Sequence, residues 1–244
     1  MLCGVLLFAV YVAACSKGSD RQATSDSAAA GTTAAKSTAR DTIVAATAKD
    51  AQTDAKVPMI FVGTSLTAGL GLEPDSAYPM LIQRKIDSAG LPFEVTNAGV
   101  SGETSAGLID RLDWLLRGNF KVLVLETGAN DGLRGVPTAS LRANLSTALD
   151  RIKAARPDAK IVVVQMEALP NLGPKYASEF HSLYADVTKA KGVTLIPFLL
   201  DGVAGRRELN QGDGVHPNNR GERIVADNVW RALKPVLDSV AGKS

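Results

Sequence analysis

A serine and a histidine with suitable partners lie far apart in this sequence. Ser65 follows the apolar run 59–62 through Gly63, a residue that permits a sharp exit from a buried strand. Near the other end, Asp213-Gly-Val-His216-Pro places a carboxylate three residues before a histidine, across a turn that contains glycine. A serine nucleophile needs a base, and the base needs an orienting partner. Ser65, His216 and Asp213 could fill these roles, or Ser65 could instead be a ligand for something anionic.

Acyl transfer also needs hydrogen-bond donors directed at the developing oxyanion. The backbone N–H groups of Ser65 and Gly102 and the side-chain amide of Asn130 could supply them. Taken singly, Gly102 is more typical of a turn and Asn130 of a side chain that caps a loop. Their joint occurrence, in order and after successive strands, favours the hydrolytic interpretation.

The elements that must position these residues are predicted as alternating strands and helices. The predicted strands are 58–63, 93–97, 121–127, 160–166 and 194–197, and the predicted helices are 76–89, 105–117, 138–155, 174–191 and 218–240. This alternation indicates right-handed βαβ units and an α/β fold, a flavodoxin-like three-layer sandwich with a five-stranded parallel sheet. Loops at the carboxyl ends of such strands meet at one edge, so the polar segments are expected to share a cleft.

Four ordered blocks of the chain resemble those of the SGNH (GDSL-type) hydrolase family, and most of all its bacterial thioesterase, arylesterase and lysophospholipase branch. The blocks are Gly-Thr-Ser65-Leu-Thr-Ala-Gly, Asn97-Ala-Gly-Val-Ser-Gly102-Glu-Thr, Gly128-Ala-Asn130-Asp-Gly and Asp213-Gly-Val-His216-Pro. The resemblance covers 59–237 and implies the same flavodoxin-like fold. It implies Ser65 as the nucleophile, His216 as general base and then acid, and Asp213 as the residue that orients the histidine. It further implies an oxyanion hole formed by Ser65, Gly102 and Asn130.

One position departs from the family pattern. Thr64 stands where the family usually has an aspartate immediately before the nucleophile. Threonine keeps a hydroxyl for local hydrogen bonding but removes a negative charge near the site. We therefore predict that Thr64→Asp keeps ester hydrolysis within about tenfold of wild type, or about 1.4 kcal/mol in the barrier.

Side chains around the blocks could determine specificity. Leu66, Leu70, Leu72 and the segment 166–176 could line an acyl groove, or could simply pack between strand and helix. Arg134 could contact a phosphate or a CoA-type group, or could be a solvated charge.

Other titratable residues have simpler interpretations. Glu126 and Asp131 resemble the carboxylate pair of a glycosidase, but they are more simply explained as supports for the turn that presents Asn130. His181, the second of the two histidines, lies in a long amphipathic segment and is predicted to decorate a helix face.

Composition limits the possible partners. The chain has 244 residues, 45% of them hydrophobic, and a net charge of +2, which gives no reason to expect a nucleic-acid partner. Its two cysteines, Cys3 and Cys15, both lie at the start, so the predicted domain has no disulfide, thiol nucleophile or cysteine metal site. We expect that the protein needs no metal or organic cofactor. We also expect it to be a monomer.

The first residues are typical of an export signal. The apolar run 2–14 has 13 residues, too few for a membrane span of about 20 residues but typical of a signal-peptide core. It ends in Val12-Ala13-Ala14-Cys15, which resembles a bacterial lipobox with Cys15 as the lipidated residue; a plain secretory peptide is the alternative. Residues 16–56 are rich in Ala, Ser and Thr and are predicted to form a disordered tether to a domain at 57–244. We therefore expect an exported lipoprotein, anchored to a bacterial membrane and facing the periplasm or the cell surface.

The sequence thus predicts a lipid-anchored serine esterase that hydrolyses small acyl esters or thioesters through an acyl-enzyme on Ser65. One alternative on the same scaffold is a deacetylase acting on carbohydrate or cell-wall esters. Another is a non-catalytic surface-binding module, which would have no reason to keep Ser65, Asp213 and His216 together.

Overall fold

The structure is a computed structural model that describes residues 56–243. The leader, Cys15 and the tether up to residue 55 lie outside the described residues. The strands are β1 (Val57–Gly63), β2 (Phe93–Gly99), β3 (Val122–Glu126), β4 (Lys160–Val164) and β5 (Thr194–Ile196). The α-helices are α1 (Ser65–Ala68), α2 (Tyr78–Ser88), α3 (Ser105–Leu116), α4 (Ala129–Arg134), α5 (Thr138–Ala155), α6 (Pro174–Lys191) and α7 (Asn219–Val240).

All five strands are parallel and form one sheet in the order β2-β1-β3-β4-β5. The predicted flavodoxin-like fold with a five-stranded parallel sheet is therefore confirmed. The chain moves outward from β1 to β2 and then returns to place β3 on the other side of β1. In such sheets ligands bind beyond the carboxyl ends of the strands at this reversal point. The residues that follow β1 and β3 are thus the ones positioned to build a site.

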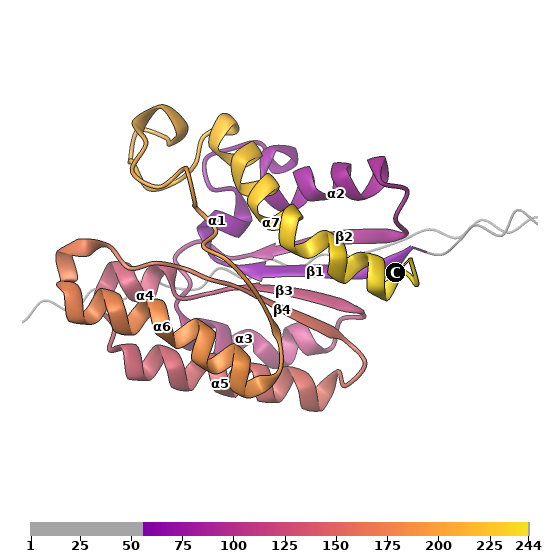
Figure 1. The fold of residues 1–244 in the computed structure, drawn as a ribbon, viewed down its shortest axis with the longest axis horizontal. Coiled ribbons are helices and arrows are strands. Elements are labelled where there is room, and N and C mark those ends of the chain that lie inside the picture. The colour runs from indigo at the N-terminus through magenta and orange to yellow at the C-terminus, as the bar shows by residue number, and fades with distance from the viewer. Residues whose placement is uncertain (1–55, 244) are drawn as a thin grey trace, which may run out of the picture. The chain divides into compact units, whose positions relative to one another are not determined.

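Helices cover both faces of the sheet (Figure 1). Helices α2 and α7 pack together on one face, whereas α3, α5 and α6 form the layer on the other. The central strands β3 and β4 are apolar because both of their faces are covered, and Val122 to Leu125 and Val162 to Val164 are fully buried. Among residues 56–243, no helix combines the length and the apolar character needed to cross a membrane.

The predicted helix 76–89 begins two residues later than expected. Residues Pro74–Ser76 form a separate 3₁₀ turn, and Ala77 is extended before α2 starts at Tyr78. The reason is Pro79, which lacks an N–H group and is therefore tolerated only in the first turn of a helix. The short helices α1 and α4 were not predicted. Each ends at a glycine in the left-handed region, Gly69 (φ 72°) and Gly135 (φ 63°).

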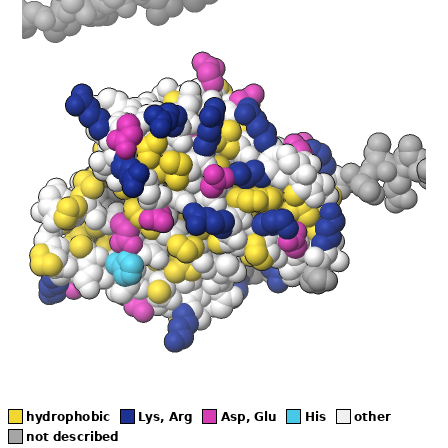
Figure 2. All heavy atoms as spheres, turned by 45° about the horizontal axis from the view of Figure 1, so that its top comes forward, with side chains coloured by type: hydrophobic (Ala, Val, Ile, Leu, Met, Phe, Trp, Pro, Cys, Tyr) yellow, Lys and Arg dark blue, Asp and Glu magenta, His cyan; other side chains and the backbone are white. Residues whose placement is uncertain are grey.

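The surface over α2 and α7 is of mixed charge. Figure 2 shows Lys and Arg side chains there interspersed with Asp and Glu and with apolar side chains, rather than gathered in one continuous stripe. Ion pairs such as Lys85–Asp227, which joins α2 to α7, connect opposite charges on this face.

Candidate active site

The turn that carries Ser65, the predicted nucleophile, follows directly from the end of β1, and we call it the nucleophile turn. Gly63 is the last strand residue, Thr64 is extended, and Ser65 is the first residue of α1. A Cβ atom at Gly63 would lie 2.0 Å from Thr67 Oγ1 and 2.6 Å from Glu126 Oε2, so only glycine fits there. Because Ser65 begins the helix, its backbone N–H has no intrahelical partner. The turn thus presents both the hydroxyl and the amide of Ser65 at the carboxyl edge of the sheet.

The histidine loop is organised by the Asp213 carboxylate. Asp213 Oδ1 accepts from the backbone N–H groups of Val215 at 2.9 Å and His216 at 3.0 Å. Gly214, which lies between Asp213 and Val215, has φ of 71°, which the turn requires. Beyond the histidine, Asn218 caps α7 by accepting from the first turn of that helix. Asp213 and His216 are therefore held in fixed relation by a tight turn that is anchored to α7.

The fold brings Asp213, His216 and Ser65 into one hydrogen-bonded chain. His216 Nδ1 lies 2.7 Å from Asp213 Oδ2, and His216 Nε2 lies 2.8 Å from Ser65 Oγ. The carboxylate requires a proton on Nδ1, which leaves the lone pair of neutral Nε2 to accept the Ser65 hydroxyl. Ser65 and His216 are 151 residues apart in the chain and meet only through the fold.

Asp213 is ionised because it is partly exposed and accepts several hydrogen bonds. Its side chain is 47% exposed, whereas that of His216 is 18% exposed. The backbone N–H of His216, with further contributions from the N–H of Val215 and the His216 ring, lowers the pKa of Asp213 to about 2. Hydrogen bonds to the charged form thus keep Asp213 a carboxylate throughout the neutral range.

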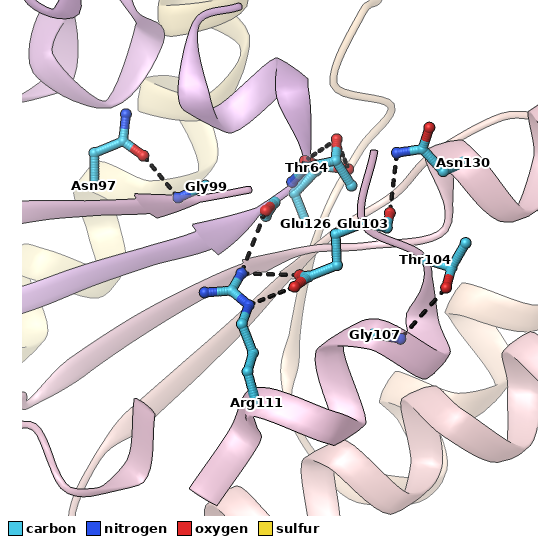
Figure 3. Close-up of polar contacts among 10 residues, drawn as sticks. Thr64, Asn97, Gly99, Glu103, Thr104, Gly107, Arg111, Glu126 and Asn130 are labelled. Atoms are coloured by element: carbon cyan, nitrogen blue, oxygen red, sulfur yellow. Dashed lines mark hydrogen bonds and ion pairs between the residues drawn. The ribbon is translucent and has the colours of Figure 1, made fainter. Parts of the chain in front are cut away.

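The loops that follow β2 and β3 meet beside the serine turn. Gly102 has φ of 79°, and its carbonyl accepts from Arg134 Nη2 at 3.0 Å. Asn130 Nδ2 donates to the carbonyl of Glu103 at 2.9 Å, as Figure 3 shows, and this contact uses one of the two amide hydrogens. The side chain of Glu103 is paired in turn with Arg111 on α3. The loop that carries Gly102 is therefore fastened from α4 and from α3.

Glu126 supports a different segment from the one predicted. This side chain at the end of β3 is buried and accepts from Thr64 N at 2.7 Å and Thr64 Oγ1 at 2.9 Å (Figure 3). It also accepts from Thr67 Oγ1 at 3.0 Å. Burial raises the pKa of Glu126, and these hydrogen bonds oppose the rise. The expectation that Glu126 supports the Asn130 turn was wrong, because its carboxylate braces the nucleophile turn. Asp131 instead accepts from the backbone and the hydroxyl of Ser105, at 2.8 and 2.6 Å.

An apolar pocket of about 110 Å³ lies beside Ser65 and the loop that carries His216. Its larger apolar side chains are Leu66, Leu133, Met166, Leu169, Phe198, Leu200 and Val215. Leu66 follows Ser65 and Val215 precedes His216, so the pocket adjoins both catalytic candidates. Of the residues predicted to line an acyl groove, Leu66 and part of the segment 166–176 line this pocket. Leu70 and Leu72 do not, and Leu70 is 45% exposed.

This combination of fold and side chains matches a known family. The model of the GDSL-like Lipase/Acylhydrolase family matches residues 61–224. The chain belongs to this family.

Known members of the GDSL-like family resemble this chain over most of their length. The esterase TesA of Pseudomonas aeruginosa is 37% identical over 180 residues, which cover 73% of this chain and 89% of TesA. The arylesterase of Vibrio mimicus is 33% identical over 75% of this chain and 91% of its own length. Thioesterase 1/protease 1/lysophospholipase L1 of Escherichia coli is 32% identical over 74% of this chain and 85% of its own length.

Solved structures of GDSL-like relatives share the fold. The crystal structure of TesA superposes with a TM-score of 0.70 at 36% identity and covers 73% of this chain and 99% of that chain. The esterase EstA of Pseudoalteromonas, solved with the inhibitor monoethylphosphonate, gives a TM-score of 0.70 at 31% identity, covering 74% of this chain and 98% of its own.

Two charged or ionisable residues considered in the sequence, His181 and Arg134, do not contact Ser65, His216 or Asp213. His181 lies on α6 as predicted, with its side chain 64% exposed and Nδ1 2.6 Å from Glu167 Oε1. Arg134 is exposed, and its Nη2 donates to the Gly102 carbonyl at 3.0 Å. Within residues 56–243, no group of three His, Cys, Asp or Glu side chains could hold a metal ion.

Sequence reasoning missed the buried contacts behind the nucleophile turn. Tyr78 OH lies 2.9 Å from Thr67 Oγ1, and the backbone N–H of Tyr78 donates to Glu222 Oε2 at 2.7 Å. Burial raises the pKa of Glu222 to about 8. An acidic residue in the first turn of a helix ordinarily faces solvent near the positive end of the helix dipole, so nothing in the sequence signalled its burial.

Proposed function

We propose that this enzyme, a carboxylic ester hydrolase of the GDSL-like family, hydrolyses acyl esters or thioesters through an acyl-enzyme on Ser65. The observation that carries the proposal is the hydrogen-bonded chain from Asp213 through His216 to Ser65, with contacts of 2.7 and 2.8 Å. Both distances lie within the range for a nucleophile, its base and the orienting group. The same chain of contacts argues against a non-catalytic binding module.

In the first half of the reaction, Ser65 Oγ attacks the acyl carbonyl carbon while its proton moves to His216 Nε2. The carbonyl π electrons move to oxygen, and we assign the N–H groups of Ser65 and Gly102 and the second amide hydrogen of Asn130 to this oxyanion. The tetrahedral intermediate collapses as the bond to the alcohol or thiol breaks. His216 gives its proton to this leaving group, and the acyl-enzyme remains.

In the second half, water replaces the alcohol or thiol. His216 Nε2 takes a proton from water as the water oxygen attacks the acyl carbon, and the oxyanion forms in the same hole. Collapse breaks the bond to Ser65 Oγ, which recovers the proton from His216, and the carboxylic acid leaves. Asp213 stays ionised throughout and stabilises the imidazolium that forms twice in each cycle.

The apolar pocket supports an acyl chain as the group bound next to Ser65. Its lining is apolar except for Glu167, and leucine, methionine, phenylalanine and valine side chains make up most of the wall. Such a wall removes methylene groups from water and offers few hydrogen bonds to a sugar. The names of the relatives, which include an esterase, an arylesterase and a thioesterase, point the same way. Carbohydrate O-deacetylation remains the alternative on this scaffold.

A series of nitrophenyl esters of increasing acyl length, measured beside acetylated xylan, tests the proposal. We expect kcat/KM to rise from acetate to longer chains that fill the pocket, with little release of acetate from xylan. His216→Ala should lower kcat by at least about 10³-fold. His181→Ala, which removes the exposed histidine on α6, is the matched control and should leave kcat unchanged. A preference for acetylated xylan would favour the deacetylase, and equal activity in both variants would contradict the role of His216.

We further propose that the enzyme is exported and anchored through a lipid on Cys15, which lies outside the described residues. The proposal is supported by the 13-residue apolar run and by the small residues before the cysteine. Fatty-acid labelling and membrane fractionation of wild type and Cys15→Ser test it. The variant should lose both the label and the membrane association. If it keeps both, the lipobox interpretation is wrong.

A further inference from the structure

The histidine loop is tied to the nucleophile turn at a second point besides the Ser65–His216 hydrogen bond. Gln211 Nε2 donates to the carbonyl of Leu70 at 2.7 Å and to the carbonyl of Pro217 at 3.0 Å. These two bonds use both hydrogens of the side-chain amide. Because both neighbours are carbonyl oxygens, the nitrogen of the amide must be the atom that faces them.

The main chain of Gln211 holds the histidine loop closed. Its N–H donates to the carbonyl of His216 at 2.7 Å, and its carbonyl accepts from the N–H of Gly214 at 3.0 Å. The preceding residue, Asn210, forms an isolated antiparallel bridge with Pro217. Gln211 therefore fixes the backbone of His216 on one side and reaches the nucleophile turn on the other.

Leu70, whose carbonyl accepts from Gln211, is hydrogen-bonded to the backbone of Ser65. The N–H of Leu70 donates to the carbonyl of Ser65 at 3.0 Å. The next residue, Gly71, has φ of 79°, and a Cβ atom there would lie 2.3 Å from Gln211 Oε1. Glycine thus leaves room for the amide. Three hydrogen bonds in series, independent of the catalytic one, connect the backbone of Ser65 to the backbone of His216.

We propose that Gln211 is a positioning residue that sets the distance between Ser65 Oγ and His216 Nε2. It bonds main-chain groups rather than the reacting atoms, so it acts through the two loops that it joins. The proposal rests on the proposed roles of Ser65 and His216. A shift of about 1 Å in a catalytic group can cost about 10²-fold in rate, so a loosened histidine loop should be visible in kcat.

Two variants remove the two donors while keeping the side-chain length. Gln211→Met has no polar atoms, and Gln211→Glu places a carboxylate against the carbonyls of Leu70 and Pro217. We expect both to lower kcat on a nitrophenyl ester by about 10- to 100-fold with KM within about threefold. The rate of Ser65 labelling by a fluorophosphonate should fall by the same factor.

Gln83 on α2 provides the matched control. Its side chain also joins two segments, donating to the carbonyl of Phe93 at 3.1 Å and accepting from the N–H of Val95 at 2.7 Å. Gln83→Met should lower the melting temperature but leave kcat unchanged. If Gln211→Met keeps wild-type kcat, or loses activity only in proportion to its unfolded fraction, the positioning role is wrong. If wild type itself is not labelled at Ser65, the proposed function fails and this inference falls with it.

Discussion

The contact between Thr64 and Glu126 predicts how the protein will respond when Thr64 is replaced by aspartate, the residue expected at this position from the resemblance to the family. Thr64 and Glu126 are each only 1% exposed, and the Thr64 hydroxyl donates to the Glu126 carboxylate at 2.9 and 3.1 Å. Thr64→Asp would replace this donor with a second carboxylate at the same distance. Two buried carboxylates so close cannot both ionise, so the pair must hold a proton.

The cost of that proton can be worked out from its pH dependence. An unfolded carboxyl has a pKa of about 4, and each pH unit above this value costs about 1.4 kcal/mol to keep it protonated. The variant should therefore lose up to about 4 kcal/mol in the free energy of unfolding at pH 7. The sign follows from linkage. The pair of carboxyls has a higher pKa in the folded protein than in the unfolded chain. The loss in the free energy of unfolding is therefore absent below the unfolded-state pKa and grows as the pH rises toward the folded-state pKa.

Denaturant unfolding at pH 5, 7 and 8.5 measures this loss. Thr64→Asn is the matched control, because it has the shape of aspartate but its amide can still donate to Glu126. We expect the stability difference between the two variants to grow by up to about 1.4 kcal/mol per pH unit. At a pH where the variant is folded, Thr64→Asp should keep ester hydrolysis within about tenfold of wild type. Equal stability of the two variants at every pH would refute the reasoning.

Three further predictions concern other parts of the site. Burial raises the pKa of Glu222 to about 8 in the folded protein, so its ionisation lowers the free energy of unfolding as the pH rises from about 4.5 to 8. Glu222→Gln should therefore raise the melting temperature at pH 9 and leave it unchanged near pH 4. Asp213→Asn should lower kcat by about 10²- to 10³-fold in steady-state assays, less than for a buried triad aspartate because Asp213 is half exposed. Asn130→Ala should lower kcat by about 10²- to 10³-fold with little change in KM, as expected for a lost oxyanion donor.

The sequence was most informative where one residue type in one local pattern carries the chemistry. Ser65 after a buried strand and His216 three residues after Asp213 could be selected because few residue types can do their work. Strand ends were predicted to within about two residues, because a strand ends where its neighbour stops pairing and not where its own apolar run stops.

The contacts that hold these side chains in place could not be predicted. Thr64 and Glu126 are 62 residues apart, Gln211 and Leu70 are 141 apart, and Tyr78 and Glu222 are 144 apart. No local pattern reports which distant carboxylate or amide will lie against a given loop. Such pairings depend on the register of the packed elements, which only the fold determines.

The central claim is that Ser65, activated by His216, forms a covalent bond with the acyl group. Its most direct test is the mass of the intact protein after reaction with a fluorophosphonate, followed by mapping of the modified peptide. We predict a single adduct on Ser65 in wild type, no adduct in Ser65→Ala, and labelling at least about 10²-fold slower in His216→Ala. An adduct on another residue, or labelling as fast in His216→Ala as in wild type, would contradict the account.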